Sequence, residues 1–263
     1  MNAEKIIFGG PSCTNLPKVH DGNLHVLPPC KQGDVYLAAI ENPKVIGIID
    51  GYFEGVPSVW HKEILWAMDQ GIHVIGASSM GALRAAELDT YGMKGLGQVY
   101  EWYATNTIND DDEVALVHAP DALNYTPISL AMVNVRATCK KAQHEKTLSD
   151  KLAEEIQKTA KAIFYKHRTW QEVLDQMPKS DFVPEEVIQF ESWLQHNEVD
   201  QKSLDALQLY TYLSQNEFSD PYESNFEFEY TEFWHQTTSR WIERTARQEP
   251  DDERNGDGYR LFS

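Results

Sequence analysis

The chain of 263 residues is 41% hydrophobic, so it can bury a core large enough for one large domain or two modest ones. Its 41 Asp and Glu outnumber 23 Lys and Arg, and the net charge of -18 argues against nucleic acid as a partner because it repels phosphates. Neither a secretory signal nor about 18 consecutive apolar residues occurs, so we expect a cytoplasmic protein without a membrane span.

The first half of the sequence alternates short apolar runs with helical patterns. Strands are predicted at residues 5–8, 44–49 and 72–75, a helix is predicted to open at Asp34, and another covers residues 58–70. This alternation is typical of βαβ units, in which a helix connects two parallel strands. The predicted fold class is therefore α/β, with a mostly parallel sheet flanked by helices in the N-terminal half and an all-helical C-terminal region.

The second half carries apolar residues at the three- and four-residue spacing of helices. The predicted helices cover residues 130–143, 150–166, 169–177, 184–196 and 203–215. Residues 220–234 are rich in Tyr, Phe and Glu, and suit a strand, a surface helix or a partner-docking arm. We predict an α/β core domain over residues 1–128, a helical region packed on it over 129–246, and a disordered tail over 247–263.

The most specific local pattern is Gly-Ala-Ser-Ser-Met-Gly-Ala at residues 76–82, where a predicted strand meets a turn and an alanine-rich helix. A serine at such a junction projects its hydroxyl from the carboxyl end of the sheet, and the amides of Met80 and Gly81 would bind an oxyanion. We predict Ser79 as the nucleophile and keep Ser78 as the alternative. The same small residues also suit a tight turn that only lets helix and strand pack closely, so the pattern alone leaves both interpretations open.

A serine nucleophile needs a base, and Asp50, His61 and Lys62 fall in segments expected at the same carboxyl edge of the sheet. If Ser58 caps the second helix, the helix dipole disfavours the Lys62 ammonium by about 0.3–1 kcal/mol, far less than a neutral amine at pH 7 requires. Burial would have to supply the rest. Without it, Lys62 is a solvated helix lysine and His61 a packing residue.

Two further polar groups carry weaker predictions. Arg84 and Glu87 stand three residues apart on the helix after the serine turn and are expected to pair, either in support of the site or for structure alone. The acidic run at residues 110–113 suits a divalent cation, guanidinium groups of a partner or a solvated loop. We predict no metal site there, because consecutive acids point in different directions.

The three cysteines are too far apart for a disulfide framework or a CxxC metal site. They are Cys13, Cys30 and Cys139, and we expect free thiols. Cys13 follows the first strand and ranks below Ser79 as a nucleophile, because no neighbouring feature of the sequence lowers a thiol pKa.

Five ordered motifs resemble the core of the TfuA family. They are IIDGYF, VPSVWHKEIL, GASSMGALRAAEL, YGMKGLG and DDDEVALVH, and the resemblance covers about residues 6–136. The helical half adds only the stretch 202–213. Five motifs in order are far more specific than one serine turn, so the chain is identified as similar to TfuA proteins.

The resemblance implies a role beside YcaO enzymes, which activate a peptide amide so that sulfur can replace the carbonyl oxygen. A TfuA protein is expected to hydrolyse the C-terminal thiocarboxylate of a ubiquitin-like sulfur carrier of the ThiS type and to release hydrosulfide. It is also expected to help YcaO engage its precursor peptide or target protein. The family's Ser-Lys pair maps onto Ser79 and onto Lys62 in WHKEIL, with Lys94 in YGMKGLG as the alternative lysine.

Two other functions compete with this one. The chain would serve as a non-catalytic scaffold or activator if it only binds YcaO and the sulfur carrier. A phosphate or nucleotide site at the helix after Ser79 is the weaker alternative, because no GxxxxGK[ST] run is present. Neither a cofactor nor a metal is expected.

Overall fold

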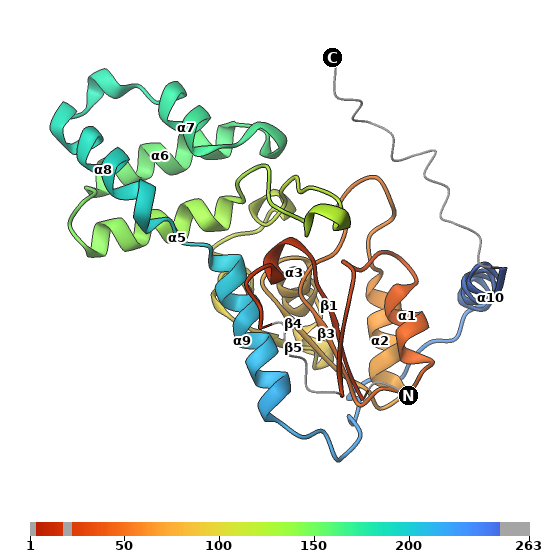
Figure 1. Cartoon of the computed structure of the whole chain (residues 1–263). Coiled ribbons are helices and arrows are strands. Elements are labelled where there is room, and N and C mark those ends of the chain that lie inside the picture. The colour runs from red at the N-terminus through yellow and green to blue at the C-terminus, as the bar shows by residue number, and fades with distance from the viewer. Residues whose placement is uncertain (1–3, 18–22, 248–263) are drawn as a thin grey trace.

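A five-stranded parallel sheet forms the centre of the protein (Figure 1). The computed structural model describes residues 4–17 and 23–247, and the strands lie in the order β2-β1-β3-β4-β5. The strands are β1 (Lys5–Phe8), β2 (Leu24–Leu27), β3 (Val45–Ile48), β4 (His73–Ala77) and β5 (Lys94–Leu96). Because all five run in the same direction, the loops that follow them emerge at one edge of the sheet.

The central strands are buried on both faces, which explains their content of Ile and Val. Every residue of β1 and β3 is buried, as expected where helices cover both sides of a parallel sheet. Ile6, Ile46 and Ile48 contact one layer of helices, whereas Ile7 and Val45 belong to the core on the opposite face. Because helices cover both faces, functional side chains can gather only at the ends of the strands.

Different helices cover the two faces. The core of the first face includes residues of α1 (Asp34–Ala39), α2 (His61–Asp69) and α3 (Met80–Glu87). On the second face, Leu209 and Leu213 of α9 (Gln201–Gln215) pack against the strands. Asp205 of α9 also accepts hydrogen bonds from the amides of Gln98 and Val99, at 3.1 and 2.7 Å, and so caps α4 (Gln98–Ala104).

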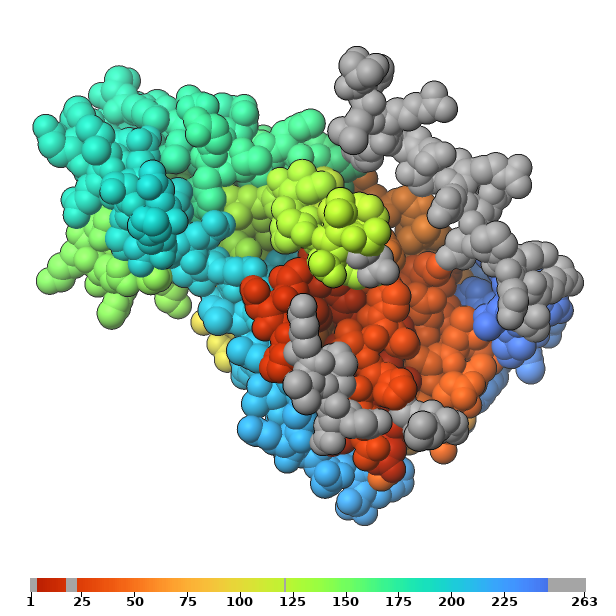
Figure 2. Space-filling view, viewed as in Figure 1, coloured from red at the N-terminus to blue at the C-terminus, as the bar shows by residue number. Residues whose placement is uncertain are grey.

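A second helical layer stands apart from the sheet and has its own core. It consists of α5 (Met132–His144), α6 (Asp150–Ala162), α7 (Trp170–Gln176) and α8 (Pro184–Asn197). Figure 2 shows the segment around residues 115–130, in yellow-green, between this helical cluster and the sheet-containing core. Because α9 returns to the sheet, we propose that the helical domain ends before α9 rather than at residue 246.

The last helix, α10 (Glu232–Arg247), lies beside α1 and α2 (Figure 1). Its Trp234 and Trp241 rings contact Tyr36 of α1, with ring centroids 5.6 and 5.7 Å away. The chain from α9 to α10 is neither helix nor strand over residues 216–231, so the undecided segment 220–234 is an irregular connection that ends in the first residues of α10. No helix of the described residues has the length and apolar character needed to cross a membrane.

The predicted fold class is confirmed, and the differences are local. The strands β2 and β5 were not predicted, because β5 is only Lys-Gly-Leu and β2 is a half-exposed edge strand. The apolar residues 114–117, which follow the acidic run, form no strand. Helix α2 begins at His61 after Trp60, whereas the expected cap, Ser58, donates to the carbonyl of Tyr52. The predicted tail falls outside the described residues, apart from Arg247.

Candidate active site

Ser79 lies at the junction between β4 and α3, as the sequence predicts. β4 ends at Ala77, Ser78 adopts a left-handed φ of 70°, and Ser79 directly precedes the first residue of α3. A left-handed conformation costs a non-glycine residue about 1–2 kcal/mol, so its surroundings must hold it. The Ser78 hydroxyl does so by donating to the carbonyl oxygen of Lys202 at 2.8 Å. Ser78 therefore fixes the turn, and Ser79 is the serine that borders a cavity.

The glycines of this turn allow helix and strand to pack closely. A Cβ atom on Gly76 would collide with the carbonyl of Gly81, and one on Gly81 would collide with the carbonyl of Ile48. The packing interpretation of the small residues is thus confirmed. It does not compete with a catalytic role, because the same close approach places Ser79 at the carboxyl edge of the sheet.

Only one of the two predicted oxyanion amides is available. The amide of Gly81 donates to the carbonyl oxygen of Ile49 at 3.1 Å, so it is already used. The amide of Met80, the residue after Ser79, has no acceptor among the described residues. In a nucleophile elbow, the residue after the serine supplies one of the oxyanion donors. Met80 remains the candidate for that role.

A lysine that the sequence did not suggest as the base borders the same cavity. Lys202 is the second residue of α9, and its side chain is buried, with 3% of the residue exposed. Its amine donates to the carbonyl oxygen of Val114 at 2.8 Å and has no other acceptor among the described residues. Burial lowers the pKa of Lys202, and the nearby carboxylates of Asp50 and Asp200 oppose that shift. A buried amine with one acceptor is suited to the neutral form.

Asp50 organises the loop that faces this lysine. It follows β3, and its carboxylate accepts hydrogen bonds from the amides of Gly10 and Ser12, at 2.9 and 3.0 Å. It also accepts from the Ser12 hydroxyl at 2.7 Å. Three donors hold one buried carboxylate, so Asp50 fixes the loop after β1 against the end of β3. The predicted supporting role of Asp50 is thus one of positioning.

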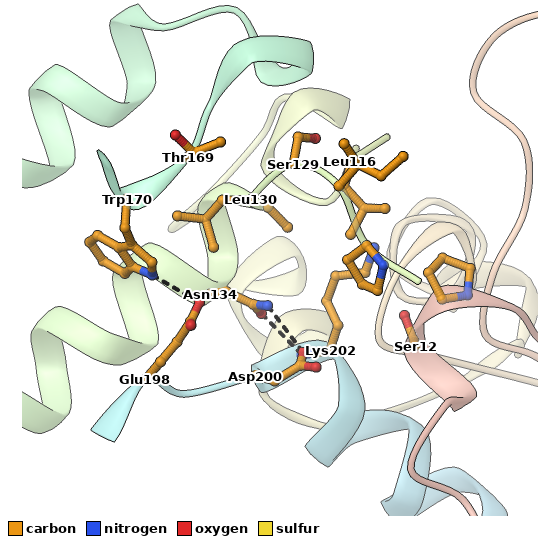
Figure 3. Close-up of a pocket in the computed structure, with 14 residues that line it drawn as sticks. Ser12, Leu116, Ser129, Leu130, Asn134, Thr169, Trp170, Glu198, Asp200 and Lys202 are labelled. Carbon is orange, nitrogen blue, oxygen red and sulfur yellow. Dashed lines mark hydrogen bonds between the residues drawn. The ribbon is translucent and has the colours of Figure 1, made fainter. Parts of the chain in front are cut away.

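We call the cavity that contains these groups the serine cavity. It has a volume of about 470 Å³ and lies between the ends of the strands and the segment before α5. Its polar lining residues are Asp50, Tyr52, Glu54, Ser79, His118, Tyr165, Lys166 and Lys202. A neighbouring cavity of about 410 Å³ shares Pro11, Leu116 and Lys202 with it. Figure 3 shows Lys202 in that neighbouring cavity, rising from the start of α9 toward Leu116.

Lys62, the predicted base, lies elsewhere. Its amine is 3.4 Å from the Thr231 hydroxyl and 5.2 and 5.9 Å from the ring centroids of Phe228 and Trp234. These three residues belong to α10 and the chain before it, which cover α1 and α2. The structure therefore does not bring Lys62 together with Ser79, because the side chain of this partly exposed lysine lies beside the rings of Phe228 and Trp234 and does not border the serine cavity.

Lys94, the alternative lysine, lies on the edge strand β5 and away from the serine cavity. It is the first residue of β5 and pairs with Ile75, two residues before β4 ends. Its amine donates to the Tyr212 hydroxyl at 2.8 Å and lies 4.2 Å from the centroid of that ring. Lys94 therefore fastens the amino end of β5 to α9 and does not border the serine cavity.

The remaining predicted residues form a surface network between α2 and α3. Arg84 and Glu87 pair as expected, with 2.6 Å between their charged atoms, and His61 lies 2.8 Å from the same carboxylate oxygen. Arg84 also donates to the carbonyl oxygen of Val59 at 3.2 Å. None of these three side chains borders the serine cavity, so their contacts support a structural role.

The acidic run is neutralised by basic side chains. Within the described residues, it holds the one group of carboxylates close enough together to share a metal ion. The amine of Lys161 contacts all three, and Arg136 and Arg168 each donate to one of them. The carboxylates belong to Asp110, Asp112 and Glu113. This arrangement fits an ion-pair cluster that joins the loop to α5 and α6.

The fold and the site define a parallel α/β protein with a serine and a buried lysine in one cavity at the carboxyl edge of its sheet. The family model described as TfuA-like protein matches residues 50–169, so the resemblance found in the motifs is confirmed and this region is TfuA-like. That family is associated with YcaO systems. Comparison of the sequence with curated proteins gave no match.

The matched region includes Ser79 but ends well before Lys202. The only sequence signal for this lysine was its place at the start of the stretch 202–213, the weak part of the resemblance. Lys202 stands two residues after Asp200 at the start of an apolar helix, and neither neighbour in the sequence indicates that its side chain is buried. Only the return of α9 to the sheet places it in the serine cavity.

Proposed function

We propose that this protein is a Ser-Lys hydrolase that releases hydrosulfide from the C-terminal thiocarboxylate of a ThiS-like sulfur carrier. It would do so in the cytoplasm, next to a YcaO enzyme that thioamidates a peptide or protein, and it would help that enzyme bind its peptide. Ser79 is the nucleophile, as predicted, and Lys202 replaces Lys62 as the base. One observation carries this assignment: the serine hydroxyl and a buried lysine with one acceptor border the same cavity.

The reaction begins with a proton transfer from Ser79 to the neutral amine of Lys202. The serine oxygen attacks the thiocarboxylate carbon, and the Met80 amide donates to the oxygen that becomes negative. The carbon–sulfur bond breaks, the sulfur takes up one proton from a group in the cavity and leaves as hydrosulfide, and an ester joins the carrier to Ser79. Water hydrolyses this ester, which frees the carrier carboxylate and restores the serine.

The local structure supports each part of this sequence. Ser78 ties the nucleophile turn to the backbone of Lys202, so serine and lysine are fixed relative to each other. Burial favours the neutral amine, which is the form that accepts a proton. Asp50 holds the loop after β1 beside the cavity. Preorganisation of this kind is what covalent catalysis requires.

The test measures sulfide released from a purified thiocarboxylated carrier. Ser79→Ala and Lys202→Met should each lower the rate by about 100-fold or more, because each removes a partner of the first proton transfer. Lys62→Met is the matched control and should retain most of the activity, because Lys62 does not border the serine cavity. Full activity in both Ser79→Ala and Lys202→Met would refute the proposal.

The same variants separate the enzyme from a scaffold. A scaffold that only binds YcaO and the carrier gives no sulfide release with the wild-type chain, yet it stimulates YcaO equally with or without the Ser79 hydroxyl. An enzyme loses both sulfide release and stimulation in Ser79→Ala while it still binds YcaO in a pull-down.

A further inference from the structure

His118 borders the serine cavity from the segment before α5, and the mechanism above gives it no task. The backbone around it is fixed by a short paired loop. Ala119 donates to the carbonyl of Thr126 at 2.9 Å, Ile128 donates to Val117 at 2.7 Å, and His118 itself forms an antiparallel bridge with Pro127. The imidazole is therefore attached to a defined backbone rather than to an open loop.

The structure also fixes which ring nitrogen of His118 can exchange protons. Nδ1 lies 2.8 Å from the carbonyl oxygen of Ala119, and a carbonyl only accepts, so Nδ1 carries a hydrogen. This leaves Nε2 as the atom that gains or loses a proton. The rings of Tyr52 and Tyr125 flank the imidazole, with centroids 6.3 and 5.5 Å away, and restrict its rotation.

The proposed reaction moves protons at two places besides the serine. A thiocarboxylate sulfur is already negative, so it leaves the carbon readily only when it takes up a proton, and the ester intermediate later needs a base that accepts a proton from water. One base can serve all these steps, as histidine does in a Ser-His-Asp triad. A second carrier in the cavity instead lets Lys202 keep the serine proton and return it to the serine oxygen, while the other group serves the sulfur and the water.

We propose that His118 is this second proton carrier, an inference that rests on the hydrolase function proposed above. In the first step, Ser79 gives its proton to Lys202, the serine oxygen bonds to carbon, the carbon–sulfur bond breaks, and protonated His118 gives the Nε2 proton to the sulfur. In the second step, water attacks the ester, His118 takes one water proton at Nε2, and Lys202 returns its proton to the serine. The cycle consumes thiocarboxylate and water and yields carboxylate, hydrosulfide and one proton.

Other titratable groups share the cavity with the imidazole. Tyr52 and Tyr125 lie beside the ring, and the remaining groups come from three parts of the chain. They are Asp50, Glu54, Tyr165, Lys166 and Lys202.

The experiment compares two small probes, thioacetate and 4-nitrothiophenyl acetate, in the full-length protein. The second probe releases a thiolate that is stable without a proton, so its first step does not need His118. His118→Asn keeps a donor near the Nδ1 position but lacks Nε2. We expect it to lower sulfide release from thioacetate by about 100-fold. With the nitrothiophenyl ester it should give a stoichiometric burst of thiolate followed by slow turnover.

The matched control is His61→Asn, which alters an exposed histidine outside the cavity and should behave like the wild type. Thermal unfolding checks that His118→Asn is folded. Wild-type rates with both probes would overturn the inference, and so would a burst reduced as much as the turnover in a folded variant. If Ser79→Ala still releases sulfide, the hydrolase function itself fails; if Ser79→Ala is inactive and His118→Asn is normal, only the role of His118 fails.

Discussion

Lys202 and Lys62 are both the second residue of a helix, yet they occupy opposite environments. Lys62 follows Trp60 and His61 at the start of α2, and Lys202 follows Asp200 and Gln201 at the start of α9. The helix dipole acts on both ammonium groups in the same direction and by a similar amount. Lys62 is partly exposed and lies beside the rings of Phe228 and Trp234, whereas Lys202 is buried at the end of the sheet. Burial, rather than helix position, therefore distinguishes the candidate base.

This difference shows why a motif lysine and a functional lysine need not coincide. The WHKEIL motif contains a structural residue of a different kind, because Glu63 next to Lys62 is fully buried. Its carboxylate accepts the amides of Trp60 and Gly33, at 2.7 and 3.0 Å, and so joins the starts of α2 and α1. The motif then marks how two helices are fastened together, and Lys62 continues outward from the same turn.

The largest effect should come from replacing Lys202 with arginine. Lys202→Arg roughly keeps the length of the side chain but replaces the neutral amine with a guanidinium that stays charged at all working pH values and so cannot accept a proton. The rate of sulfide release should fall by about 100- to 10,000-fold. In the wild type, the rate should fall as the pH drops through the lowered pKa of Lys202, because the amine then becomes charged.

The pH profile gives this prediction its control. Lys62→Arg should keep both the rate and the acid limb of the wild-type profile. Near-normal sulfide release by a folded Lys202→Arg would show that the buried amine is not the base. Lys202 and Lys62 would then not differ in function.

A smaller effect is expected from replacing Asp50, which is buried beside the serine cavity as Lys202 is. The Gly10 and Ser12 amides donate to one carboxylate oxygen of Asp50, so the side-chain oxygen of Asp50→Asn can still accept both, but it is uncharged and the new amine faces the Ser12 hydroxyl. Loss of the charged acceptor should lower the unfolding free energy by about 1–3 kcal/mol. We expect a loss of about 10-fold in sulfide release as the loop loosens. The carboxylate also raises the pKa of Lys202, so its removal should move the acid limb to lower pH.

Chemical denaturation and a pH–rate profile of Asp50→Asn measure these effects together. Asp89→Asn serves as the control, because Asp89 is exposed and does not border the serine cavity. An unchanged acid limb would mean that Asp50 and the base do not interact.

The sequence predicted the serine turn better than the residues around it, for a physical reason. A βα turn is a local structure, and the small residues at 76–82 must be adjacent for helix and strand to approach. Strands rich in Ile and Val, such as β1 and β3, are local signals of the same kind. The base is not local, since α9 lies more than a hundred residues after Ser79 and reaches the sheet only after the helices α3 to α8. Likewise, nothing adjacent in sequence shows that Gly81 has its amide occupied by Ile49.

The smallest effect should follow from Lys62→Met, which tests the partly exposed lysine of the pair. The variant keeps most of the side-chain length but removes the charge above the Phe228 and Trp234 rings and the contact with Thr231. Such interactions contribute about 0.5–1 kcal/mol at partly exposed sites, so the unfolding free energy should fall by no more than that. Sulfide release should stay within about twofold of the wild type, because surface changes rarely disturb a distant site. A loss as large as that expected for Lys202→Arg, in a variant that unfolds normally, would instead give Lys62 a part in the reaction. The assignment of the two lysines would then be reversed.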